Sequence, residues 1–164
     1  MMEKTMEIIR PLIPLEEAIR KKLKQYNRFR LAKIPESAER AILYRPYYYA
    51  EMNTTFTVLK KNRESREIVL VDALSGVPAL VNGEVDFLTL NEDSLPGRIV
   101  VPQISKDQGE EIALDTVAKA IFRKYRHFPR CRLNQHTLIY RLFCCLQDGP
   151  GAPLIFPGDG YDLG

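Results

Sequence analysis

Two stretches of this sequence mix basic and aromatic side chains in a way that suits contact with phosphates and bases. Residues 20–33 hold seven Lys or Arg, residues 123–132 hold five, and each stretch contains one tyrosine and one phenylalanine. Cations attract phosphates and rings stack on bases, so one hypothesis is a nucleic-acid-binding protein. In the alternative interpretation, cations at helix C-termini complement the helix dipole while the rings face the core. The residues considered for phosphate contact are Arg20, Lys24, Arg28, Arg30, Arg123, Lys124, Arg126 and Arg130.

A run of tyrosines offers a second candidate surface. Tyr47, Tyr48 and Tyr49 follow Pro46 in a stretch with strand composition. Neighbouring residues of a strand point to opposite faces, so at least one of these rings is expected on the outer face of a sheet. A proline in a strand donates no ladder hydrogen bond, which indicates an edge strand or a bulge. The three tyrosines are therefore candidate contacts for a peptide or protein partner, or for self-association by strand addition. The alternative is that they fill a small core.

Residues that could support catalysis are few and scattered. His127 and His136 lack the spacing of a metal site, and an exposed loop position is the simpler interpretation of both. No serine lies in a nucleophile-elbow motif, and no glycine-rich phosphate loop occurs. Asp72 stands beside Ser75-Gly76, where an aspartate commonly caps backbone amides of a turn. The sequence thus predicts a protein that is not an enzyme and has no metal or cofactor.

The composition bounds the protein class. The 164 residues suffice for one ordinary domain or two small ones, and 45% hydrophobic with 27% charged residues is typical of a folded protein. The net charge of +3 does not by itself argue for nucleic acid. No apolar run reaches the length of a membrane span and the first ten residues carry charges, so a cytoplasmic location is expected. The cysteines fit reduced thiols rather than a disulfide framework or a zinc site; they are Cys131, Cys144 and Cys145.

Helices and strands alternate in a recognisable order along the chain. Apolar residues at helical spacing predict a helix from residue 15 to 26, and a clear apolar stripe predicts another from 112 to 125. Strands are predicted at 41–59, 67–73, 77–81, 84–90, 137–146 and 154–156. The charged residues 60–66 are interpreted as a connecting loop, and Asn82-Gly83 predicts a tight hairpin.

The two halves of the chain look related. Leu43-Tyr44-Arg45 in the first half is echoed by Ile139-Tyr140-Arg141 in the second, and each follows a helical segment. This pattern predicts an α+β fold of two related helix-plus-antiparallel-sheet units, residues 1–91 and a shorter unit at 92–164, packed together as one globule.

The first half resembles a known family. A helix, a Tyr-Pro-aromatic strand and a strand that ends in Val71-Asp72-Ala73-Leu74-Ser75-Gly76 resemble PepSY-like modules, and cystatin-like folds share the broad layout. The resemblance covers residues 11–81, and in residues 102–156 it extends only to the helix and hairpin. It implies non-catalytic work, such as binding a peptide or regulating a neighbour. The first hypothesis is therefore an interaction or regulatory module with a peptide or protein partner, and the alternative is nucleic-acid binding through the basic helix ends.

Overall fold

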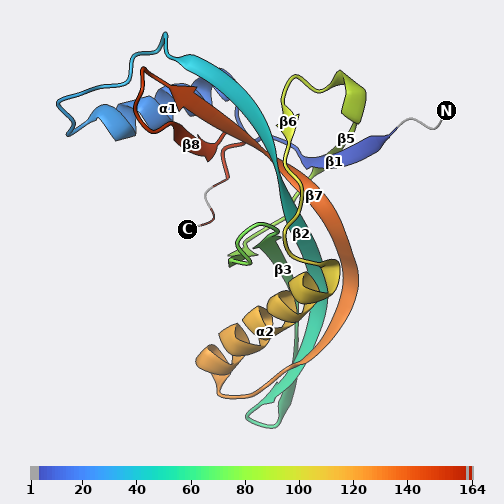
Figure 1. Cartoon of the computed structure of the whole chain (residues 1–164). Coiled ribbons are helices and arrows are strands. Elements are labelled where there is room, and N and C mark those ends of the chain that lie inside the picture. The colour runs from blue at the N-terminus through green and yellow to red at the C-terminus, as the bar shows by residue number, and fades with distance from the viewer. Residues whose placement is uncertain (1–3, 162, 164) are drawn as a thin grey trace. The chain divides into compact units, whose positions relative to one another are not determined.

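The computed structural model describes residues 4–161 and residue 163 and has an α+β fold of two helices and a mixed sheet (Figure 1). The helices are α1 (Leu15–Asn27) and α2 (Lys106–Tyr125), with a short 3-10 helix η1 (Glu92–Ser94). The strands are β1 (Thr5–Ile9), β2 (Glu39–Val58), β3 (Lys61–Asp72), β4 (Pro78–Val81), β5 (Phe87–Asn91), β6 (Arg98–Ile99), β7 (Arg130–Gln147) and β8 (Leu154–Pro157). Neither helix of the described chain combines the length and apolar character that a membrane crossing needs.

The chain divides into two compact units, and each unit takes segments from distant parts of the sequence. Among the described residues, unit 1 consists of 4–45, 85–100 and 140–161. Unit 2 consists of 46–84 and 101–139, with residue 163. The predicted division at 91/92 does not follow these boundaries, and its outermost residues 1–3, 162 and 164 lie outside the described chain.

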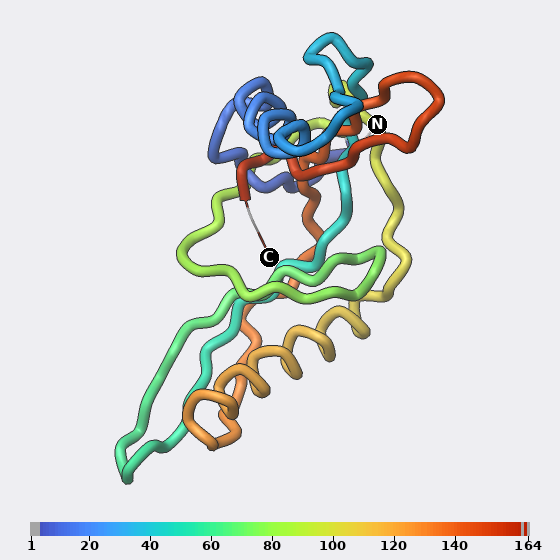
Figure 2. The backbone as a smooth tube through the Cα atoms, turned by 90° about the vertical axis from the view of Figure 1, so that its left-hand side faces the viewer, coloured from blue at the N-terminus to red at the C-terminus, as the bar shows by residue number. Residues whose placement is uncertain are grey.

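Unit 2 is a long hairpin covered by a helix. β2 and β3 pair in antiparallel register over twelve positions, from Tyr47 opposite Asp72 to Val58 opposite Lys61. Alternate residues of both strands face α2 and form an apolar cluster with it, as period-2 alternation requires. Figure 2 shows α2 running along this hairpin. The members of the cluster are Tyr48, Ala50, Met52, Phe56, Val69, Val71, Ala73, Ala113, Val117 and Ile121.

Helix α2 begins with strong local signals. Ser105 accepts a hydrogen bond from the backbone N–H of Gln108, whose side chain in turn accepts one from the Ser105 N–H. This capping box satisfies two backbone donors that a helix start leaves unpaired. The helix ends at Arg126, which takes the left-handed conformation with φ of 60°.

Unit 1 also contains a hairpin with a helix packed against it, and this hairpin is shorter. β7 and β8 pair over four positions, and α1 contributes Ile19 and Leu23 to a cluster with residues of both strands. In the same unit, β1 lies between β5, to which it is antiparallel, and β7, to which it is parallel. A second cluster gathers side chains of β1, β2 and their neighbours, with Met6, Ile8 and Tyr44 fully covered.

The order of the elements along the chain is reciprocal between the units. Helix α1 precedes β2, yet it covers the hairpin that β7 forms with β8. Helix α2 precedes β7, yet it covers the hairpin that β2 forms with β3. Each long strand therefore starts in the unit of the helix before it and ends in the other unit. This order is compatible with the predicted duplication, which itself stays a prediction.

Four sequence expectations need correction. Residues 60–66 are not a loop, because β3 begins at Lys61 and the turn consists of Leu59 and Lys60, both with positive φ. The Asn82-Gly83 turn does not join a hairpin, since β4 pairs with β3 while β5 pairs with β1. Strand β1 was not predicted. The prediction that Pro46 marks an edge strand is also wrong, because β2 lies between β3 and β7 in the sheet. Pro46 is tolerated there because it falls between the pairing with β6, which ends at Tyr44, and the pairing with β3, which begins at Tyr47.

Candidate functional site

The three tyrosines proposed as partner contacts are buried in unit 2. Tyr47, Tyr48 and Tyr49 are 7%, 5% and 3% exposed, because residues 46–50 are covered on both faces of the strand. The Tyr48 hydroxyl donates to the backbone oxygen of Ile104 at 2.6 Å, and its ring lies directly against Gly109. Burial raises the pKa of Tyr49 to about 12. The expectation of an exposed ring is thus not met, and the core alternative describes all three residues.

The basic residues of unit 1 lie exposed at and beyond the end of α1. Arg20 and Lys24 project from the helix, and Arg28 and Arg30 follow it. Two of these cations already rest on rings: the Arg30 guanidinium lies 3.9 Å from the centroid of Tyr26, and that of Arg28 lies 5.3 Å from the centroid of Phe29. The Arg30 contact covers one face of Tyr26, which is itself half-buried, whereas Phe29 stays 89% exposed.

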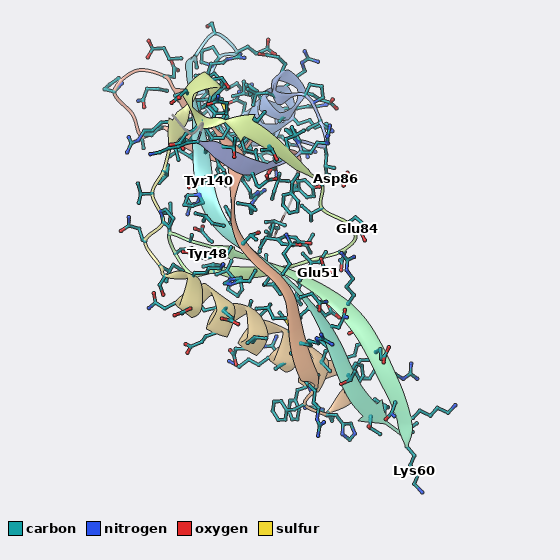
Figure 3. All side chains as sticks on the ribbon, turned by 90° about the vertical axis from the view of Figure 1, so that its right-hand side faces the viewer. Tyr48, Glu51, Lys60, Glu84, Asp86 and Tyr140 are labelled. Carbon is teal, nitrogen blue, oxygen red and sulfur yellow. The ribbon has the colours of Figure 1, made fainter. Side chains whose placement is uncertain are left out.

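The basic residues of unit 2 belong to a larger group than the sequence reasoning recognised. Arg123, Lys124 and Arg126 end α2, and Arg130 begins β7. The β2–β3 hairpin adds further cations from the segment interpreted as a loop. We call residues 53–66 and 119–132 together the basic tip; Figure 3 labels Lys60 at the end of its hairpin. Its ten Lys or Arg are Lys60, Lys61, Arg63, Arg66, Lys119, Arg123, Lys124, Arg126, Arg130 and Arg132, against one acid, Glu64.

Three surface hollows open on the basic tip. The first, about 540 Å³, is lined by Asn53, Thr54, Thr55, Glu64, Ser65, Arg66, Arg130, Cys131 and Arg132. The second, about 320 Å³, lies between the hairpin and the end of α2, and its lining includes Phe56, Lys124 and Tyr125. The third, about 500 Å³, is lined by Thr55, Phe56, Thr57, Asn62, Arg63, Glu64, His127, Phe128 and Arg130. All three share Glu64, so they surround one short segment of β3.

The cations of the tip differ in how they are held. Arg66 donates to Glu51 at 2.7 Å and to Glu84 at 2.5 Å, both labelled in Figure 3, and this contact holds the pKa of Glu51 below its usual value. Arg63, Arg130 and Arg132 are exposed and form no salt bridge with any residue that the structure describes. Their charge is therefore available to an anionic ligand.

The outer face of this part of the sheet is polar and uncovered. Glu51 pairs opposite Ile68 and Thr55 opposite Glu64, so these residues point away from the face that α2 covers. Within the basic tip, exposed Asn53, Thr57 and Asn62 belong to the same face. Hydroxyl and amide groups next to arginines without salt bridges commonly donate hydrogen bonds to phosphate and sugar oxygens.

The residues considered for catalysis are held in a turn or are at least partly buried, except His127, which is exposed. Asp72 accepts hydrogen bonds from the backbone N–H groups of Leu74 and Ser75, which is the turn role favoured from the sequence. Burial raises the pKa of Cys131 and Cys144, so both thiols stay protonated at neutral pH. The interpretation of His136 as an exposed loop residue is wrong, because it lies half-buried in β7. Its ring lies 5.6 Å from that of Tyr48, and burial lowers its pKa. Among the described residues, no group of three or more His, Cys, Asp or Glu is placed to hold a metal ion.

Comparison with known proteins adds no assignment, since no family model, no curated protein and no solved structure matches this chain. The class that fold and site define is thus an α+β protein with a polar, strongly basic surface at one end of unit 2.

Proposed function

We propose that this protein is a non-catalytic nucleic-acid-binding module that contacts its ligand through the basic tip of unit 2. The observation that carries the proposal is the gathering of ten cations and one acid on two adjoining segments. The ten cations and one acid of the tip sum to +9, whereas the whole chain has a net charge of +3, so the remaining residues carry 3 − 9 = −6. Charges are screened within about 8 Å at physiological ionic strength, and a ligand therefore responds to the tip rather than to the net charge.

A phosphate backbone fits this surface in three respects. Arg63, Arg130 and Arg132 have no acidic partner within the described chain and can each meet a phosphate. The cations extend over a hairpin, a helix end and a strand, which suits an extended polyanion rather than one small anion. Exposed Phe128 stands among them, and an aromatic ring between cations is a common base-stacking surface.

The test is the salt dependence of binding by the whole chain. We expect a fluorescein-labelled 20-nucleotide single strand of mixed sequence to bind in a fluorescence-anisotropy titration. With four phosphate contacts, the affinity should fall roughly 50-fold between 50 and 200 mM salt. The variant Arg63→Gln/Arg130→Gln/Arg132→Gln should lower the slope of log affinity against log salt concentration by about two.

A matched control comes from unit 1. The variant Arg20→Gln/Lys24→Gln/Arg28→Gln removes the same charge from the other basic helix end and should leave the slope close to that of the wild type. Equal losses in the two triple variants would show that binding follows net charge rather than the tip. Absence of binding at 50 mM salt would refute the proposal.

A peptide or protein partner is the second candidate, and one feature of β3 favours it. β4 pairs with β3 only at residues 68–71, so residues 61–67 have β2 on one side and no strand of the described chain on the other. An open edge can accept an added strand. Self-pairing there would oppose like charges on Lys61, Arg63 and Arg66, so an extended acidic peptide fits better than a second copy.

Hydrogen exchange distinguishes the two candidates. Strand addition pairs backbone amides, so an acidic peptide ligand should slow amide exchange in residues 61–67. Phosphate contact through arginine side chains leaves those amides exposed. If a glutamate-rich peptide binds as tightly as the oligonucleotide and protects this edge, the peptide candidate replaces the nucleic-acid proposal.

A further inference from the structure

The basic tip contains an aromatic platform that is already assembled. The rings of Phe122 and Phe128 are stacked, with centroids 4.4 Å apart and planes at 14°. Phe128 is nevertheless 70% exposed, so one face of its ring is covered by Phe122 while the other is open. Phe122 belongs to α2, which fixes the orientation of the pair. A ring that is held in place loses little conformational freedom when a planar ligand stacks on it.

The open ring borders a hollow with the polar groups that a nucleotide needs. The hollow of about 500 Å³ is also lined by Arg63, His127 and Arg130. Its volume lies within the ~300–1,000 Å³ usual for small-ligand sites. Thr57 and Asn62 also line it, and the Thr57 hydroxyl donates to the side-chain oxygen of Asn62 at 3.1 Å.

We propose that this hollow takes one unpaired base of the nucleic acid, stacked on Phe128 and read along its N–H edge by Glu64. The inference rests on the proposed function and narrows it to single-stranded ligands, because a base inside a duplex has neither an open face nor a free Watson–Crick edge.

Glu64 decides which base fits. It is the one acidic residue of the basic tip, it is exposed, and within the described chain it forms no salt bridge. An ionised carboxylate only accepts hydrogen bonds, so it repels phosphate and attracts N–H groups. Guanine presents two neighbouring N–H donor groups on its Watson–Crick edge, matching the two carboxylate oxygens, whereas adenine, cytosine and thymine each present one donor group there. The geometry therefore favours guanine at this position.

Stacking is tested first, with a thymidine 12-mer that carries one central 2-aminopurine. We expect its fluorescence to be quenched on binding to the wild type, and Phe128→Ala to remove the quenching and weaken binding about tenfold. Phe128→Tyr keeps the platform and should retain both. Phe29→Ala, which removes the exposed ring of unit 1, is the matched control and should change neither.

Base choice is tested with thymidine 12-mers that differ only in a central guanine or thymine. The wild type should prefer the guanine strand about tenfold. Glu64→Gln removes a negative charge, so both strands should bind more tightly, but the amide offers one donor and one acceptor and the preference should disappear. Glu67→Gln removes the same charge from a residue outside the 500 Å³ hollow and should keep the preference.

The outcomes separate this inference from the proposed function. If Phe128→Ala binds like the wild type and 2-aminopurine is never quenched, the platform is refuted while the arginine-dependent salt slope still stands. A preference that survives Glu64→Gln refutes the assignment of Glu64 alone. If the wild type binds no strand at low salt, both the inference and the proposed function fail.

Discussion

The two units differ mainly in how far the hairpin extends beyond the helix-covered core. In unit 1, β7 and β8 pair over four positions, and α1 covers them with Ile19 and Leu23. In unit 2, β2 and β3 pair over twelve positions, while the buried residues that β2 contributes to the cluster under α2 end at Phe56, with Val58 partly buried against them. The hairpin continues past these residues with exposed Leu59, Lys60 and Lys61. Unit 2 thus has a length of hairpin that lies outside its helix-covered core.

The units also differ in where one strong ion pair lies. Unit 1 buries an ion pair: Arg141, 2% exposed, donates to both carboxylate oxygens of Asp159, 0% exposed, at 2.9 and 3.1 Å. Unit 2 gathers cations on its surface and leaves several without a partner among the described residues. Removing one partner of a buried pair costs stability, whereas surface cations without acidic partners repel one another, and their gathering in unit 2 supports the proposed contact with an anionic ligand.

Breaking the buried pair should have the largest effect on stability. Arg141→Met leaves the Asp159 carboxylate buried without its cation, so we expect a loss of about 3–5 kcal/mol in the free energy of unfolding. Urea denaturation at pH 7 measures it. Lys119→Met removes an exposed pair with Asp115 in unit 2 and should cost under about 1 kcal/mol. Similar losses in the two variants would contradict the contrast between the units.

A pH-dependent loss of stability should trace to His136 of unit 2. Burial lowers its pKa below 6.5; Glu110 and Asp107 oppose this shift, and Lys106 adds to it. The unfolded chain then binds the proton more readily, so stability should fall as pH drops below 6.5, by at most about 1.4 kcal/mol per pH unit. The fall ends once pH is below the folded-state pKa.

Denaturation at several pH values between 7 and 5 checks this contribution. His136→Phe keeps an aromatic ring beside Tyr48 but cannot bind a proton, so its stability should depend less on pH than that of the wild type. His127→Gln leaves His136 in place and should keep the wild-type pH dependence. If His136→Phe and the wild type lose stability in parallel, the assignment to His136 is wrong.

Relieving the hairpin turn should have the smallest effect. Leu59 and Lys60 have φ of 50° and 63°, values that residues other than glycine and asparagine rarely adopt. Leu59→Asn/Lys60→Gly places the preferred residues of a type I′ turn there and should stabilise the protein by about 0.5–1 kcal/mol. Thermal unfolding measures the gain. In unit 1, Gly149 already occupies a positive-φ turn position with φ of 68°, so Gly149→Ala should lower the melting temperature instead.

Local signals predicted the elements well, and long-range pairing accounts for most of the errors. Helical spacing identified α1 and the body of α2, and strand composition identified β2 and β4. The five residues of β1 carry little pattern of their own; they become a strand because Thr5 to Ile9 pair with residues 87–91, some eighty positions away. The same pairing removes β5 from the hairpin that Asn82-Gly83 predicts. Such partners are set by tertiary packing, which local sequence does not encode.

The sequence predicted one part of the basic tip and missed the other. The basic residues at the end of α2 were recognised, but those of β3 were assigned to a loop because charged residues on both faces hide the strand alternation. The tyrosines were misjudged because alternation gives opposite faces but does not say that both are covered at residues 46–50. The resemblance to PepSY-like modules stays a prediction, since nothing compared with this chain bears on it.

The reciprocal order of helices and hairpins governs how the protein can be made. When the ribosome has released α1 and β2, the hairpin that α1 covers has not yet been synthesised, so unit 1 stays incomplete until the last strand emerges. Contacts between such distant residues slow folding. A chain cut between residues 91 and 92 separates each helix from the hairpin it covers. We therefore expect neither fragment to fold alone, whereas the two together hold every described element of both units.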